Sequence, residues 1–274
     1  LKLNWMSSNE YHQFLTDRLL GKLETPITER QHDQVCTMNV QLDVDPQSIP
    51  NARWYEDKFY LMLGCLNPQN LEMQMTLANL MTKVPRRLSF AVGWSIGSLE
   101  NKLPELMAAL VKNLSNPNSL IRISAAVALR STKNIPNQVI NDLITIAEDN
   151  KNIIHLRLAA LDTLATLKIN NKQIFKRLSK LIESNQPAEV RYSAIQALGN
   201  FENLDLESII GLVYQLEDSD AQIRLLTLRA FEKLLPDDDF AKKRIASCIE
   251  DTDQSVARTA KDVTNALSKK YKKQ

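Results

Sequence analysis

Four arginines recur along this chain at a nearly constant spacing, and each directly follows an aliphatic residue. The aliphatic residues are separated by 35, 34 and 33 positions, and Val256 lies another 33 further on. Self-similarity at a period of this size is typical of a solenoid, in which each unit buries its apolar face only against its neighbours. The sequence therefore predicts a repeat architecture. The four pairs are Ile121-Arg122, Leu156-Arg157, Val190-Arg191 and Ile223-Arg224.

A stripe of small and apolar residues accompanies the aliphatic residue of each repeat. One small residue follows after four positions and a further small or apolar one after seven, so that all three share one helix face. We expect this stripe to be a packing surface that lets the adjacent helix approach closely, with bulkier neighbours filling the remaining space. The two rows are Ala125, Ala160, Ala194, Thr227 and Ala260, then Ala128, Thr163, Ala197, Ala230 and Val263.

Another amphipathic stretch precedes each of these helices, and a short polar link joins the two. The links, such as Asp218-Ser219-Asp220 and Asp251-Thr252-Asp253, are rich in residues that cap helix starts and favour turns. Links of this length make consecutive helices antiparallel, so the predicted unit is a helical hairpin. The preceding helices are expected at 103–114, 136–147, 174–183, 206–216 and 240–249.

This pattern resembles the HEAT repeat family, whose units are antiparallel helix pairs with an aliphatic-Arg-x-x-Ala-x-x-Ala-Leu motif. The segment AEVRYSAIQALG at 188–199 matches best, and the resemblance covers residues 100–268 well. Arg87 and Ala91 indicate one or two degenerate units over 52–99, while Ala257 replaces the arginine in the last repeat. The resemblance implies an all-α fold, a right-handed α-α superhelix of antiparallel helix pairs. A content of only six glycines agrees with it.

Three segments are expected along the chain. Residues 1–51 should form an N-terminal helix, over about 7–23, and an irregular capping segment; residues 52–268 the solenoid; and residues 269–274 a basic C-terminal tail. The tail, Lys-Lys-Tyr-Lys-Lys-Gln, is interpreted as solvated, with contact to acidic lipid or protein as the alternative. Trp5, Trp54 and Trp94 are expected in the core or at repeat joints rather than as exposed anchors.

Localisation is only weakly constrained by the sequence. The chain begins at Leu1 without an initiator methionine, so we expect a processed or partial chain whose upstream signal or anchor is not seen. Cys36, Cys65 and Cys248 form no CxxC pair, and buried free thiols favour a reducing, cytoplasmic location. A periplasmic or anchored domain, with a Cys36–Cys65 bridge in a secreted form, stays open. The oligomeric state is not indicated.

The sequence carries no pattern typical of a catalytic or metal site. His12, His32 and His155 are isolated, and no HExxH, GxGxxG or GxSxG motif occurs. HEAT-like deoxyhypusine hydroxylases carry repeated His-Glu pairs that hold a di-iron centre, and this chain has no such pair. We therefore expect no catalytic residue, no metal site and no cofactor.

The arginine ladder, Arg122, Arg157, Arg191 and Arg224, has two interpretations. The family resemblance implies structural pairing with an acid in a neighbouring turn, because a planar guanidinium suits bridging between repeats. The alternative is a row that binds a phosphate backbone or an acidic peptide. A formal net charge of +2 over 274 residues argues against a nucleic-acid partner. The candidate acids are Asp149, Glu183, Glu189, Asp218 and Asp220.

The leading functional hypothesis is a non-enzymatic scaffold that binds a protein on the concave face of the solenoid. Positions two, six and ten after the motif's aliphatic residue point away from the packing stripe. The alternatives are a HEAT-like bilin lyase or chaperone-type protein and a HEAT-like DNA-lesion-binding protein. The candidate partner-binding residues are Leu158, Asp162, Tyr192, Gln196, Asn200, Leu225, Arg229 and Lys233, with Thr166 at the equivalent position of the first of these repeats.

Overall fold

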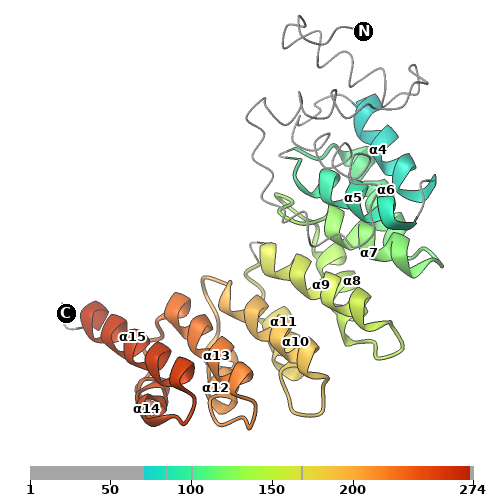
Figure 1. The fold of residues 1–274 in the computed structure, drawn as a ribbon. Helices are drawn as coiled ribbons and strands as arrows, with labels where there is room; N and C mark the ends of the chain where they lie inside the picture. Colours follow the sequence, from blue (N-terminus) through green and yellow to red (C-terminus); the bar gives the residue numbers. More distant parts are fainter. Residues whose placement is uncertain (1–70, 84–85, 100, 168, 272–274) are drawn as a thin grey trace, which may run out of the picture. The chain divides into compact units, whose positions relative to one another are not determined.

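The computed structural model describes residues 71–83, 86–99, 101–167 and 169–271 (Figure 1). These residues form twelve α-helices, α4 to α15, one 3-10 helix, η3, and no strand. The chain divides into two compact units, Leu1–Ile135 and Pro136–Gln274. The predicted N-terminal helix, the boundary at residue 51, Trp5, Trp54, Cys36 and Cys65 lie outside the described residues.

Unit 1 is held together by close packing of two helices. Helix α5 packs against α4 and most extensively against α7, and α6 packs against α4 and α7. A side chain at Gly93 would place its Cβ 2.5 Å from the carbonyl oxygen of Ser124, and one at Gly97 would lie 2.9 Å from that of Val127. The two glycines therefore allow the backbones of α5 and α7 to touch. The helices are α4 (Leu71–Lys83), α5 (Arg86–Gly97), α6 (Pro104–Leu114) and α7 (Ser119–Ala128).

Two lateral contacts complete unit 1. The Lys102 ammonium donates to the carbonyl oxygens of Gly97, Leu99 and Arg130, each at 3.2 Å, and so joins the carboxyl ends of α5 and α7. Burial lowers the Lys102 pKa to about 8. Trp94 is half-buried, and the Arg130 guanidinium lies 4.4 Å from the centre of its ring. The expectation that Trp94 lies at a joint is thus met.

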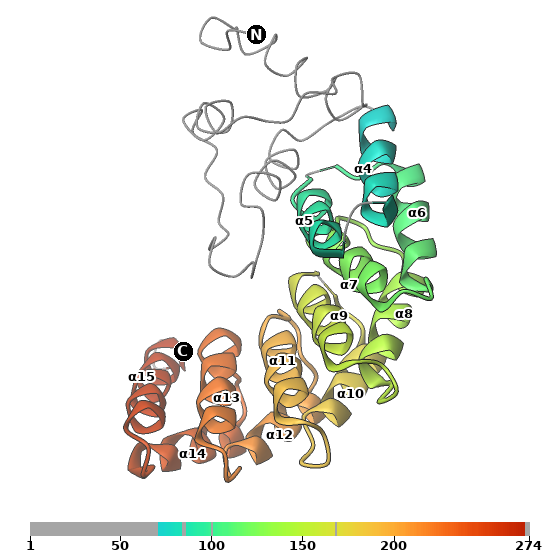
Figure 2. The ribbon, with the colours of Figure 1, turned by 45° about the vertical axis from the view of Figure 1, so that its right-hand side comes forward.

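Unit 2 consists of successive helix pairs, and their first and second helices form two layers (Figure 2). Helices α9, α11, α13 and α15 pack against one another and form what we call the second-helix layer. Helices α8, α10, α12 and α14 form the first-helix layer. The bounds are α8 (Asn137–Glu148), α9 (Ile154–Thr166), α10 (Lys172–Leu181), α11 (Ala188–Gly199), α12 (Leu206–Gln215), α13 (Ala221–Leu234), α14 (Asp239–Ser247), η3 (Cys248–Glu250) and α15 (Gln254–Tyr271).

The small-residue stripe is the core of each second helix, as the sequence predicts. All ten stripe residues are buried, and Leu129, Leu164, Leu198 and Phe231 are completely buried beside them. A Cβ at Gly199 would lie 2.6 Å from that of Ala230, so α11 and α13 also approach closely. Cys248 is a buried free thiol, and burial raises its pKa.

Polar residues cap the first turns of α10, α12, α13, α14 and α15 in unit 2. Asn171 accepts hydrogen bonds from the amides of Gln173 and Ile174 at the start of α10, and Asp220 accepts one from Gln222 at the start of α13. These side chains satisfy amides that have no partner within the helix. The link that ends at Asp220 therefore acts as the cap that its composition predicts, whereas α8, α9 and α11 start at Pro136, Ile153 and Pro187 without a side-chain cap.

The C-terminal end differs in part from the expected tail. Helix α15 continues through Tyr271, so the first residues of the predicted tail are helical. The Lys270 ammonium and the Tyr271 hydroxyl both donate to the carbonyl oxygen of Leu235, at 3.0 and 2.8 Å. Leu235 has a left-handed backbone at φ 42° where α13 ends, and these donors hold its carbonyl. Lys269 is exposed.

Candidate functional site

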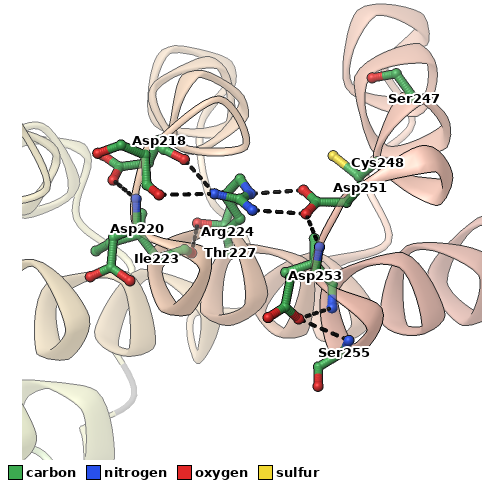
Figure 3. Close-up of polar contacts among 12 residues, drawn as sticks. Asp218, Asp220, Ile223, Arg224, Thr227, Ser247, Cys248, Asp251, Asp253 and Ser255 are labelled. Atoms are coloured by element: carbon green, nitrogen blue, oxygen red, sulfur yellow. Dashed lines mark hydrogen bonds and ion pairs between the residues drawn. The ribbon is translucent and has the colours of Figure 1, made fainter.

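Arg224 joins two consecutive interhelix links (Figure 3). Its Nε and Nη2 atoms each donate to the Asp251 carboxylate at 2.7 Å, a bidentate pair, while Nη1 donates to the carbonyl oxygens of Asp218 and Ser219. The side chains of Arg224 and Asp251 are 13% and 10% exposed. The hydrogen bonds from Arg224 lower the pKa of Asp251. Arg224 is therefore committed to a largely buried structural role.

Arg191 makes the equivalent connection one repeat earlier. Its guanidinium pairs with Asp218, Nη2 also donates to Oε1 of Gln215 at 3.0 Å, and Nε donates to the carbonyl oxygen of Ile182. Both members of the ion pair are largely buried. Asp218 also contacts the next arginine of the ladder, since its backbone carbonyl accepts a hydrogen bond from Arg224 (Figure 3).

Arg157 occupies the same position with neutral acceptors. Its Nε donates to the carbonyl oxygen of Ala147 at 2.7 Å, and Nη2 donates to Oε1 of Gln186 at 2.9 Å. Burial lowers the pKa of Arg157, and the nearby charge of Asp149 opposes that shift. Arg122 takes the corresponding place in α7 of unit 1 and is half-buried.

The acids proposed for the ladder are only partly those observed. Asp218 pairs with Arg191, as expected. Asp251, absent from the candidates, pairs with Arg224, and its place in the link between the two helices of the last repeat is the signal that would have identified it. Asp220 caps α13 instead. In the structure, Arg191 and Arg224 form ion pairs and Arg157 has neutral acceptors, and the structural interpretation of the whole ladder stays a prediction.

The eight candidate partner-binding residues lie outside the packing stripe. Five are exposed and three half-buried; seven lie on α9, α11 and α13 of the second-helix layer, and Asn200 directly follows α11. Because α11 packs between α9 and α13, equivalent positions lie in rows across the layer. The exposed ones are Asp162, Gln196, Asn200, Arg229 and Lys233, and the half-buried ones are Leu158, Tyr192 and Leu225.

Three of these candidates also connect neighbouring repeats. The Tyr192 hydroxyl donates to Asp220 at 2.5 Å. At the other end of the helices, Asn200 donates to the carbonyl oxygen of Ala165 at 3.2 Å and accepts from Lys233 at 2.6 Å. A second polar ladder, which the sequence pattern did not reveal, therefore runs along the carboxyl ends of α9, α11 and α13.

The Tyr192–Asp220 contact changes the electrostatics of both groups. The hydrogen bond to Asp220 raises the pKa of Tyr192, and the same bond lowers the pKa of Asp220. Asp220 is therefore ionised at neutral pH while it caps α13 and holds the tyrosine ring in place.

Known structures identify the fold. The archaeal HEAT-like repeats protein from Thermococcus onnurineus NA1 matches with a TM-score of 0.51 and 12% identity, over 83% of this chain and 98% of the archaeal one. The chain has a HEAT-like repeat fold. No protein-family model and no curated protein matches the sequence. The HEAT-like assignment therefore describes the architecture alone.

Designed proteins with armadillo repeats are also similar to this HEAT-like chain. One matches with a TM-score of 0.43 and 16% identity, over 76% of this chain and 99% of its own. Another, from a structure described as computationally designed armadillo repeat proteins for modular peptide recognition, matches with a TM-score of 0.43 and 14% identity, over 76% of this chain and 98% of its own. At these scores, the peptide recognition stated for them is not transferred to this chain.

The described part of the chain offers no other obvious site. Among residues 71–271 that are described, no group of three or more histidine, cysteine, aspartate or glutamate side chains could hold a metal ion. None of the described helices is both long and apolar enough to cross a membrane. His155 is exposed on α9.

Proposed function

We propose that the chain is a non-enzymatic scaffold that binds a protein partner on the exposed side of the second-helix layer. The observation that carries this proposal is the separation of two sets of residues on the same helices. One set forms the buried stripe and the arginine ladder, and the other remains accessible in adjacent rows. A rigid frame that presents accessible side chains in rows is suited to recognition.

The chemical character of the rows favours a protein partner. Leu158, Tyr192 and Leu225 are half-buried at the same position of three consecutive second helices, and so provide an apolar row. Gln196 and Arg229 supply polar and charged groups beside it. An apolar centre with polar surroundings resembles a protein interface, in which tyrosine and arginine often contribute most of the affinity.

A site-specific cross-linking experiment tests the proposed surface. A photo-reactive phenylalanine at Gln196 should cross-link a protein partner in native lysate, whereas the same group at Lys243, exposed on α14, should not. Tyr192→Ala combined with Arg229→Glu should abolish the cross-link. Tyr192→Phe retains the ring and removes only the bond to Asp220, so it should preserve binding.

Two results would contradict the proposal. Cross-links of equal yield from positions 196 and 243 would show that the layer is not selective. Cross-linking at position 196 that survives the double substitution, in a chain shown to be folded by circular dichroism, would show that the named side chains are not used.

A further inference from the structure

The accessible charges of the second-helix layer change sign along unit 2. Helices α9 and α11 expose Asp162 and Glu189 and no lysine or arginine, because Arg157 and Arg191 are buried. Helices α13 and α15 expose two acids, Glu232 and Asp262, among six basic residues. The basic residues are Arg229, Lys233, Arg258, Lys261, Lys269 and Lys270.

Position on the helix selects the residues that face a ligand. Arg229 is six residues after Ile223 and Arg258 two after Val256, so both lie on the side opposite the buried stripe at ~100° per residue. The pair brackets the end of the apolar row at Leu225, since α13 packs against α15. We call Leu225, Arg229 and Arg258 the basic end of the layer.

The basic end differs from the arginine ladder in how its charges are used. Arg191 forms an ion pair with Asp218, and Arg224 forms one with Asp251. Arg229 and Arg258 are exposed and have no ion pair of 4 Å or less within the described residues. An accessible guanidinium can donate two hydrogen bonds to a carboxylate without first losing another partner.

We propose that the basic end binds an acidic protein segment, whose carboxylates contact Arg229 and Arg258 while its apolar side chains contact Leu225 and Tyr192. This inference rests on the proposed function and specifies the chemistry of the partner. Complementary charge at an interface mainly sets specificity and association rate, and the apolar row supplies area to bury.

A nucleic acid fits the same surface less well. Its phosphates would continue from the basic end onto α11 and α9, where Glu189 and Asp162 present negative charge. The whole chain carries a formal charge of only +2, which provides little of the electrostatic attraction that dominates binding to nucleic acid. An acidic segment that ends in apolar residues avoids this repulsion.

Selection from a random dodecapeptide library against the folded chain tests the inference. Peptides with an excess of acidic residues next to apolar ones should be enriched. A labelled peptide from this set should bind more weakly when the ionic strength rises to about 0.15 M, where charges are screened beyond ~8 Å. Replacement of its glutamates by glutamine should weaken binding about tenfold.

Charge variants locate the binding. Arg229→Glu with Arg258→Glu should weaken binding of the acidic peptide about tenfold or more, because two attractions become repulsions. Asp262→Asn should tighten it, since this exposed acid follows Arg258 by one helical turn. Lys180→Glu with Lys243→Glu makes the same change in charge on the first-helix layer and should alter binding less than twofold, about 0.4 kcal/mol.

Several outcomes would overturn the inference. These are enrichment of neutral or basic peptides, absence of any enriched peptide, equal loss in the first-helix control, and binding of short duplex DNA or anionic lipid vesicles in preference to the acidic peptide. If the native partner still cross-links at Gln196 in the Arg229→Glu, Arg258→Glu chain, the proposed surface stands and only its acidic specificity fails.

Discussion

Arg191 and Arg224 occupy the same position in consecutive repeats and share one link between them. The Asp218 carboxylate pairs with Arg191, and the Asp218 carbonyl accepts from Arg224. Each arginine therefore connects its own repeat to the next through atoms that are largely withdrawn from water. Loss of one partner would leave a buried charge without its counterion, which is costly.

Replacement of Arg224 by methionine should lower the free energy of unfolding by about 3 kcal/mol, because Asp251 would lose both hydrogen bonds in a largely buried place. Arg224→Lys should restore only part of the lost stability, because the lysine ammonium keeps the positive charge but cannot form the bidentate pair. Denaturant unfolding would measure the differences. Lys243→Met, on an exposed position, should change stability by less than about 0.5 kcal/mol; an equal effect of the two methionine variants would refute the argument.

Acid should weaken the ladder through Asp251. Its native pKa is lowered by Arg224, so the unfolded chain binds the proton more readily than the folded one. The stabilisation is complete above the unfolded pKa of about 3.9 and is lost as the pH falls through the lower native pKa. Asp251→Asn should therefore show a shallower decrease in unfolding free energy below pH ~5 than the native chain. Thr252→Ala, in the same turn, should follow the native slope; a native slope in the asparagine variant would exclude this contribution.

At the level of helices, packing depends on how closely two backbones can approach. Helices α5 and α7 meet at Gly93 and Gly97, and α11 meets α13 at Gly199. Gly211, in contrast, lies in α12 where an added Cβ would come no closer than 3.9 Å to its neighbours. An added methyl group is thus too close to a neighbouring helix at Gly93, Gly97 and Gly199, but has room at Gly211.

Gly93→Ala should destabilise unit 1 by about 1–3 kcal/mol, because the new methyl group would meet the backbone oxygen of Ser124 and the helices would have to separate. Gly211→Ala should instead stabilise the chain by about 0.5–1 kcal/mol, because alanine restricts the unfolded chain and fits without contact strain. Thermal unfolding of both variants measures the contrast. A Gly93→Ala chain as stable as the Gly211→Ala chain would show that the α5–α7 approach is not limiting.

The sequence predicted the helices well, because the period of the stripe and the link composition both depend on local chemistry. The predicted 206–216 helix, for example, is observed as Leu206–Gln215. The contacts of Tyr192, Asn200 and Lys233 were not predicted, because they depend on how consecutive helices are placed side by side. Likewise, spacing alone could not choose between Asp218, Asp220 and Asp251 as arginine partners.

At the scale of the whole molecule, the pairs of unit 2 contact mainly their neighbours, so stability should be distributed rather than concentrated in one core. Units 1 and 2 each have their own buried residues. A destabilising substitution should then promote local unfolding mainly in the helices near the substituted residue.

Val256→Ala in α15 should cost about 2 kcal/mol through lost packing, and amide hydrogen exchange should accelerate in α13 and α15 while α4 to α7 keep their protection. Ile96→Val in α5 is the reciprocal change in unit 1, and it should accelerate exchange in α4 to α7 while α13 and α15 keep their protection. Mass-spectrometric exchange of peptide fragments would resolve the two regions. Uniform acceleration across both units in either variant would indicate a single cooperative structure and contradict the expectation.

The second polar ladder has a consequence for redesign of the binding surface. Within the described residues, no hydrogen bond or ion pair joins Gln196, Leu225 or Arg229 to a neighbouring repeat, so a protein engineer could vary them to change specificity while the contacts between repeats persist. Asn200 and Lys233 connect adjacent helices and also belong to the surface proposed to bind the partner. A library that randomises every outward position would therefore alter recognition and weaken the contacts between repeats at the same time. Its non-binders would include chains that have unfolded.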